Sequence, residues 1–269
     1  ETMKKILNEW RRFLREQFLG MSPNVIKIED TMNDVYSRYD KRHWPIVTEA
    51  FLKFLVASPS FEALGAGGSR RAFAFANNDD YVIKIASTPS GSGLFGNTPS
   101  EMNRLEADQA MHVKYPNLFP KVYYTSPDHS WFIAQRVNTY SRKTAREDNA
   151  RIIDDFFPEL NPPFGSWWFL SSFIEEWIDL YKEVPDLDAP EPGSSNSSKS
   201  PSEVFDPIEK FKEKNKALLA KMLKNKFLND LFQAAIEFPI GYNDLHLGNV
   251  GWVEEGGKKR FVILDYILD

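Results

Sequence analysis

The residues best suited to chemistry lie near the C-terminal end of the sequence, in segment 242–249. Asp244 and Asn249 stand five positions apart there, between a stretch with helical periodicity and one typical of a strand. On one loop, an aspartate and an asparagine can converge on a substrate hydroxyl and on a metal ion. Their hard oxygen atoms suit Mg²⁺ that is also bound by phosphate groups. The alternative is a helix-ending loop in which both side chains only cap backbone groups.

A further carboxylate, Asp265, follows the apolar segment 261–264. We interpret this segment as a strand that carries the carboxylate to a cleft, where metal-binding acids usually lie. An aspartate that only forms a turn is the alternative.

Lys84 is the single charged residue of the apolar segment 81–86. A lysine among residues of the buried type needs an acidic partner or a path to water. One hairpin earlier lies a glycine-rich segment whose backbone N–H groups can approach phosphate oxygens closely; it contains Gly65, Gly67, Gly68 and Ser69. Together, Lys84 and the glycine-rich segment predict a phosphate site. Taken alone, the segment also fits a hairpin turn, and Lys84 also fits an edge-strand lysine that faces water.

The surrounding pattern predicts the elements that would position these residues. We expect strands at 61–64, 71–75 and 81–85, with a turn at 77–80, then a helix at 101–114 and strands at 121–125 and 131–137. Helices are expected on either side of this group, at 3–19, 45–56, 167–181, 206–224 and 227–238, and a hairpin pairs 249–253 with 261–264. The Pro- and Ser-rich segment 185–202 is expected to be a flexible insertion.

Composition excludes several classes of site and partner. The net charge of −5 gives no strong field toward nucleic acid or an anionic membrane. The absence of cysteine excludes disulfides, thiolate metal sites and a cysteine nucleophile. No apolar run approaches the length that spans a membrane. We therefore expect neither nucleic acid nor a membrane as a partner, and a cytoplasmic location in the producing or infected cell.

Together, the glycine-rich loop, the strand lysine, the Asp-x-x-x-x-Asn loop and the later aspartate resemble the protein-kinase-like superfamily. Their order carries the resemblance, which runs from about 61 to 269, with 139–225 matching only in helical character. It implies an α+β, bilobal protein-kinase-like fold. We expect helices at 1–60, an N-lobe with an antiparallel five-stranded sheet and a helix at 61–138, and a reduced, mainly helical C-lobe with the catalytic loop at 139–269.

The resemblance also implies ATP and Mg²⁺ as cofactors and a role for each matching residue. Lys84 would hold the α- and β-phosphates and pair with Glu106, with Glu101 as the reserve. Asp244 would orient the accepting hydroxyl or act as base, and Asn249 and Asp265 would bind Mg²⁺. The catalytic group is then Asp244, Lys84 and Asn249. The remaining nucleotide contacts would come from the glycine-rich loop, Gly65, Gly67, Gly68 and Ser69, and from the hinge residues Gln135 and Val137.

Some positions depart from the protein-kinase pattern. Tyr242 and Asn243 precede Asp244 where a histidine and an arginine are usual, and Asp244-Leu245-His246 replaces Asp-x-Lys. This form is similar to aminoglycoside and choline phosphotransferases, to atypical kinases and to small bacteriophage-type serine/threonine kinases. The first hypothesis is therefore a compact serine/threonine protein kinase.

Two other hypotheses stay open. The first is a small-molecule phosphotransferase, in which Glu175, Glu176 and Asp179 form an acidic pocket for a cationic substrate or, alternatively, a solvated helix face. The second is a pseudokinase that acts as a binding module. The presence of Lys84 and Asp244 argues against it, since a scaffold needs neither.

Overall fold

The computed structural model describes residues 25–66, 70–76, 78–87, 99–107, 109–140, 145–160, 167–182, 210, 213–237 and 247–264. The expected helix at 3–19 and the expected insertion at 185–202 lie outside these ranges. The chain divides into two compact units, Glu1–Lys114 with Pro120–Arg136, and Tyr115–Phe119 with Val137–Asp269. No helix among the described residues is long and apolar enough to cross a membrane.

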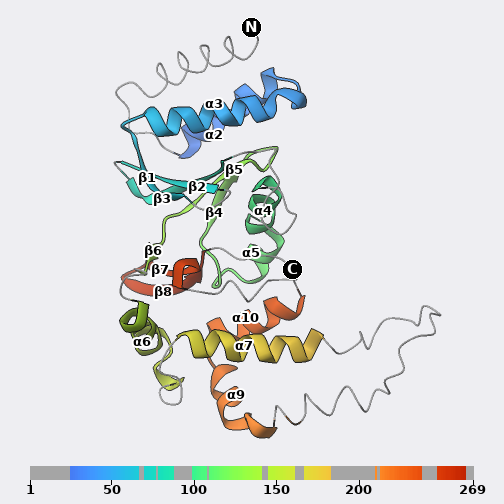
Figure 1. Ribbon diagram of the computed structural model, residues 1–269, viewed down its shortest axis with the longest axis vertical. Helices are drawn as coiled ribbons and strands as arrows, with labels where there is room; N and C mark the ends of the chain where they lie inside the picture. The colour runs from blue at the N-terminus through green and yellow to red at the C-terminus, as the bar shows by residue number, and fades with distance from the viewer. Residues whose placement is uncertain are drawn as a thin grey trace, which may run out of the picture. The chain divides into compact units, whose positions relative to one another are not determined.

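The first unit is built on a five-stranded antiparallel sheet, drawn in Figure 1, with strand order β1-β2-β3-β5-β4. Its strands are β1 Phe61–Ala66, β2 Arg70–Phe75, β3 Asn78–Ala86, β4 Val122–Thr125 and β5 Trp131–Gln135. All five predicted strands are confirmed. The turn expected at 77–80 is shorter, because β3 already begins at Asn78, whose side chain accepts the N–H of Asp80 at 2.7 Å.

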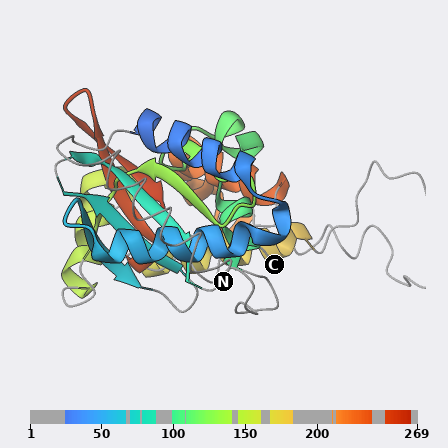
Figure 2. The same ribbon diagram turned by 90° about the horizontal axis from the view of Figure 1, so that it is seen from above.

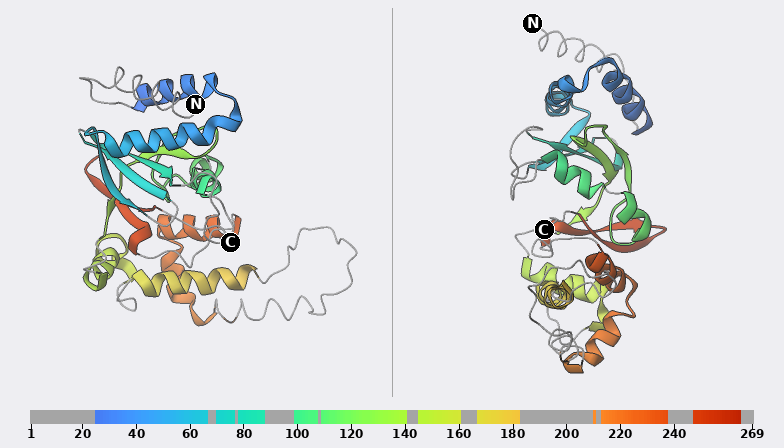
Figure 3. Two further views of the ribbon diagram at one scale, coloured as in Figure 1. Left: turned by 45° about the horizontal axis from the view of Figure 1, so that its top comes forward. Right: turned by 90° about the vertical axis from the view of Figure 1, so that its right-hand side faces the viewer.

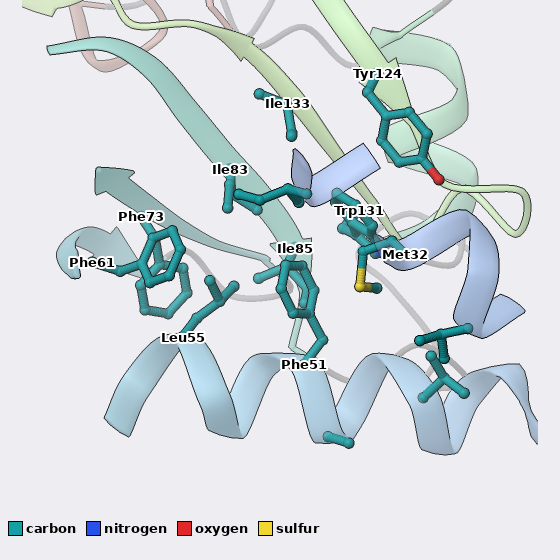
Figure 4. Packing of buried hydrophobic residues seen from close by; sticks show 14 of the residues in the cluster. Met32, Phe51, Leu55, Phe61, Phe73, Ile83, Ile85, Tyr124, Trp131 and Ile133 are labelled. Atoms are coloured by element: carbon teal, nitrogen blue, oxygen red, sulfur yellow. The ribbon is translucent and has the colours of Figure 1, made fainter. Parts of the chain in front are cut away.

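One face of the sheet is covered by two helices, α2 Val25–Arg38 and α3 Trp44–Ala57. Figure 2 shows α3 running over the sheet, and Figure 4 shows Phe51 and Leu55 pointing from α3 toward Phe73 and Ile85. These four side chains are at most 1% exposed, so the apolar positions of α3 and alternate strand positions form one core. The helix expected at 45–56 is confirmed as α3, whereas α2 was not predicted.

A hydrogen-bonded polar cluster joins these helices to the turn between β4 and β5. The hydroxyl of Tyr36, on α2, accepts from Trp131 Nε1 at 3.1 Å and donates to Asp128 Oδ1 at 3.2 Å. Thr48, on α3, bonds Ser130 Oγ at 2.6 Å. Buried polar groups need such partners, so the cluster fixes both helices to one end of the sheet.

The segment between β3 and β4 differs from the prediction of one helix at 101–114. It forms α4 Pro99–Glu106 and α5 Gln109–Lys114. A ring nitrogen of His112, Nε2, bonds the main-chain carbonyl of Glu106 at 2.8 Å. In a continuous helix that carbonyl would accept the N–H four residues later. The ring therefore competes with helix continuation and favours the break.

The second unit has a three-stranded antiparallel sheet of order β6-β7-β8. The strands are β6 Asn138–Thr139, β7 Val250–Glu255 and β8 Lys258–Ile263. The predicted hairpin is confirmed as β7 and β8, joined through Gly256 and Gly257, which both have positive φ. β6 was not predicted, because the sequence suggested that the preceding strand continued to Val137.

An aromatic core lies in the second unit. The helices among its described residues are α6 Ala145–Phe156, α7 Trp167–Lys182, α9 Lys216–Met222 and α10 Lys226–Glu237, with short 3-10 turns η4 Pro158–Leu160 and η6 Leu247–Asn249. Figure 3 shows α7 beside α10. Phe261 contacts the rings of Phe157, Trp167 and Phe227, with centroids 4.8 to 5.5 Å away.

Two predicted helices of this unit, at 167–181 and 227–238, are confirmed as α7 and α10. The continuous helix expected at 206–224 is wrong. Asn215 has φ −109° and ψ 13°, which are not helical, and it separates α9 from the residues before it. Residues 206–209 lie outside the described part of the chain.

The strand order and the Lys-bearing third strand, followed by a helix, match the α+β protein-kinase-like fold expected from the sequence. That fold is confirmed by this topology.

Candidate functional site

Lys84 lies near the C-terminal end of β3, on the sheet face opposite α3. Its cross-strand neighbours are Ala72 on β2 and Phe132 on β5, which share its face because paired antiparallel residues point the same way. The ammonium lies 5.7 Å from the centre of the Phe132 ring. The lysine side chain is 16% exposed, so its charge is largely removed from water.

Glu106, the last residue of α4, supplies the acidic partner of Lys84. Its carboxylate Oε1 accepts a hydrogen bond from Lys84 Nζ, and the residue is only 5% exposed. Glu101 was the second candidate partner for Lys84. It lies one turn and a half earlier in the helix and pairs with Arg104 on the helix surface. A buried carboxylate needs such pairing to stay charged.

Arg70 completes a triad with these two residues, and sequence reasoning missed it. Its Nη1 donates to Glu106 Oε2, while its side chain is 10% exposed. Arg71 follows on the opposite face and is exposed. The doublet Arg70-Arg71 directly after the glycine-rich loop was a signal, since alternation along a strand sends one of the two to the face of Lys84.

Helix α4 is tied to the sheet by a second buried residue, Asn103. Its Nδ2 donates to the main-chain oxygen of Ser130 at 2.9 Å, and the residue is 0% exposed. Asn103 precedes Glu106 by three positions, so both lie on the same helix face. This bond therefore helps to keep Glu106 next to the sheet.

The glycine-rich loop is described only at its start. Gly65 lies in β1 after a register shift, and a Cβ added there would meet no atom of the described residues within 4 Å. Within the described part of the chain, no side chain closes off the backbone at Gly65. Gly67, Gly68 and Ser69 lie outside the described residues, so their role as phosphate contacts stays a prediction.

The two hinge residues lie on either side of the division between the units. Gln135 ends β5, and its N–H donates to the carbonyl of Lys121 at 2.8 Å. This N–H is therefore already bonded within the sheet. Val137 is half-buried and begins the longer of the two segments of the second unit. The contacts of Gln135 and Val137 with adenine stay predictions.

In the second unit, Asn249 ends η6 directly before β7. Its main-chain oxygen accepts the N–H of Leu264 at 2.7 Å, so the end of β8 lies against the end of the Asp244–Asn249 segment. Asp265 follows Leu264 in the chain. Asp244 and Asp265 themselves lie outside the described residues. Amide and carboxylate oxygens are ligands that suit Mg²⁺, so the assignment of Asn249 and Asp265 to a metal stays a prediction.

Likeness to known proteins is found only at the level of solved structures. No protein-family model matches the sequence, and no curated protein matches it either. Among solved structures, a streptomycin–ATP–APH(2″)-IIa ternary complex is similar at 14% identity, with 84% of this chain and 71% of that chain covered and a TM-score of 0.30. The fold assignment therefore rests on the strand order and on the position of Lys84.

Proposed function

We propose that the chain is an ATP-dependent phosphotransferase that moves the γ-phosphoryl group of ATP to a hydroxyl. The observation that carries the proposal is the ion pair between Lys84 and Glu106. It joins the third strand of a five-stranded antiparallel sheet to the following helix. A buried lysine held by one carboxylate presents a fixed positive charge, which is what binding of a triphosphate requires.

The roles of the other residues follow from their chemistry. Asp244 positions the accepting hydroxyl and takes its proton as the phosphoryl group arrives. Asn249 and Asp265 would hold Mg²⁺, which when bound neutralises charge on the phosphate oxygens. Gly65 and the glycine-rich residues after it would let backbone N–H groups approach those oxygens. Gln135 and Val137 mark the segment that meets adenine.

For the acceptor, we propose a serine or threonine hydroxyl of a protein. The segment Asp244-Leu245-His246 fits compact serine/threonine kinases and small-molecule phosphotransferases alike. A cationic small-molecule acceptor such as an aminoglycoside or choline would be bound by an acidic surface. On α7, Glu176 is exposed and Glu175 is half-buried, which also fits an ordinary solvated helix face.

The test is transfer of ³²P from γ-labelled ATP with Mg²⁺ to the protein itself, to lysate proteins and to a panel of aminoglycosides and choline. Label on lysate proteins supports the protein-kinase proposal, and label on a small molecule replaces it with the alternative. An Asp244→Ala variant should transfer at least about 1000-fold more slowly while still binding ATP. ATP binding without transfer to any acceptor would leave only the pseudokinase.

A further inference from the structure

Glu106 uses its two carboxylate oxygens for two different cations. Lys84 donates to Oε1 from β3, and Arg70 donates to Oε2 from β2. The exposed fractions of the three side chains are 16%, 10% and 6% for Lys84, Arg70 and Glu106. A carboxylate fixed at both oxygens cannot rotate away from either partner. The orientation of Glu106 is therefore set from two strands at once.

Arginine suits this position better than lysine would. Its guanidinium is planar, carries several donors in a fixed arrangement and stays charged at every relevant pH. Arg70 lies opposite Ala86 on β3, two positions along the strand pair from Lys84, which faces Ala72. Both cations thus reach the end of α4 from one face of the sheet.

We propose that Arg70 is a positioning residue that holds Glu106 in place and neutralises it while Lys84 binds a phosphate. The inference rests on the proposed function. When Lys84 also binds an anionic phosphate, its ion pair with Glu106 weakens, and the charge of Glu106 is less fully neutralised. A buried carboxylate left without a cation is strongly unfavourable. Arg70 remains bound to Oε2 throughout and lowers that penalty, so ATP binds more tightly.

The experiment compares Arg70→Gln with a matched control, Arg71→Gln, by titrating each protein with ATP and Mg²⁺. Arg71 is the next residue, of the same type, but exposed on the other face. We expect Arg70→Gln to raise the Kd and the KM for ATP about tenfold, the order of one charge-assisted hydrogen bond. The KM for the phosphoryl acceptor should not change. Arg71→Gln should stay within about twofold of the wild type.

A double-mutant cycle separates action through Glu106 from direct contact with the nucleotide. In the Glu106→Gln background, adding Arg70→Gln should change the Kd for ATP by less than about twofold. Equal effects in both backgrounds would show that Arg70 contacts ATP or stabilises the fold generally, and would overturn the inference. Circular dichroism and urea unfolding identify variants that do not fold.

If Arg70→Gln does not fold, Arg70→Lys and Arg71→Lys replace the pair. An ammonium restores the charge without the planar arrangement, so Arg70→Lys should raise the Kd about threefold and Arg71→Lys should not. Equal Kd values for these two variants would reject the inference. A wild-type protein that binds no ATP would reject the proposed function and this inference with it. ATP binding that is equal in wild type, Arg70→Gln and Arg71→Gln would reject the inference alone.

Discussion

Lys84 on β3 and Glu106 at the end of α4 are 22 positions apart in the sequence and form a buried ion pair. The pair is not symmetrical, because Glu106 also binds Arg70, whereas Lys84 is proposed to bind phosphate. Removing the lysine leaves the carboxylate with one cation. Removing the carboxylate leaves two buried cations facing each other. The two changes should therefore affect stability very differently.

Replacing Lys84 by methionine should slow phosphoryl transfer strongly without unfolding the protein. Methionine keeps the length and the apolar part of the side chain, and Arg70 continues to neutralise Glu106. We expect the free energy of unfolding to fall by about 1.5 kcal/mol or less, as for a change that keeps side-chain volume, and the transfer rate to fall at least about 100-fold. Urea unfolding and the ³²P assay measure the two effects. Lys53→Met, which alters an exposed lysine paired with Glu49, is the control.

Replacing Glu106 by glutamine should destabilise the fold by about 3 kcal/mol or more, because a buried pair that loses one partner leaves charge uncompensated. Urea unfolding at constant pH measures this. Loss of stability below about 1 kcal/mol would contradict the buried triad.

The control for Glu106 is Glu101→Gln on the same helix. Pairing with Arg104 lowers the pKa of Glu101 below its usual value of 4.5. The pair therefore stabilises the fold above pH 4.5, and its contribution is lost as the pH falls below that value. Because both side chains are more than 40% exposed, we expect only about 0.5 kcal/mol from it at neutral pH.

Gly65→Ala should separate a role in nucleotide binding from a role in folding. A Cβ at Gly65 would meet no atom of the described residues within 4 Å, so the substitution should leave the free energy of unfolding within about 0.5 kcal/mol of the wild type. If the backbone there lies against phosphate oxygens, the added methyl group should weaken ATP binding at least about fivefold. Isothermal titration calorimetry measures it, and an unchanged Kd would remove Gly65 from the site.

Gly251→Ala is the contrasting change. A Cβ there would lie 2.4 Å from the main-chain oxygen of Asn138 and 2.6 Å from Val137 Cγ1. It should force β6 away from β7 and lower stability by about 1 to 3 kcal/mol. The same added methyl group should therefore be tolerated at Gly65 and should destabilise the fold at Gly251.

Tyr36→Phe should loosen the cluster that joins α2 and α3 to the sheet. The hydroxyl is the acceptor for Trp131 Nε1, and its loss leaves a buried donor unpaired. We expect a loss of about 1 to 3 kcal/mol in the free energy of unfolding. Tyr123→Phe, at a tyrosine that is 41% exposed, is the control and should have a much smaller effect.

Tyr36→Phe should also make the free energy of unfolding depend less on pH above pH 10. Burial, and then the Asp128 carboxylate, raise the pKa of Tyr36 above its usual value of 10. The unfolded chain ionises near pH 10 while the folded chain does not, so stability is full below pH 10 and falls as the pH rises. Phenylalanine removes this contribution. Burial also raises the pKa of Tyr115 to about 12, so part of the slope remains.

The sheet could be predicted from sequence because each strand is a short apolar run bounded by turn residues. Helix α2 was missed, although Ile28, Met32, Val35 and Tyr36 recur at helical spacing and are all buried. The helical spacing of these residues could therefore have been seen in the sequence. The break between α4 and α5 was less accessible, since it depends on a contact of His112 with a carbonyl six residues earlier.

The site shows the same division between local and tertiary information. Lys84 stands out because one charge interrupts an apolar strand. Choosing Glu106 over Glu101 requires the face of α4 that meets the sheet. Choosing Arg70 over Arg71 requires the register of β2 against β3, in which Ala72 faces Lys84. Strand pairing fixes that register, and the sequence of one strand does not contain it.

Asn249 is proposed to bind Mg²⁺ through its side chain. Its main-chain oxygen binds the N–H of Leu264, and alanine keeps that bond. Asn249→Ala should therefore leave the fold intact and change ATP binding only when Mg²⁺ is present. We expect the Mg²⁺ concentration for half-maximal transfer to rise at least about tenfold, the size of effect expected when one oxygen ligand is lost. Binding of ATP in EDTA should match the wild type. Equal weakening with and without Mg²⁺ would mean that Asn249 acts on the nucleotide or the loop and not on the metal.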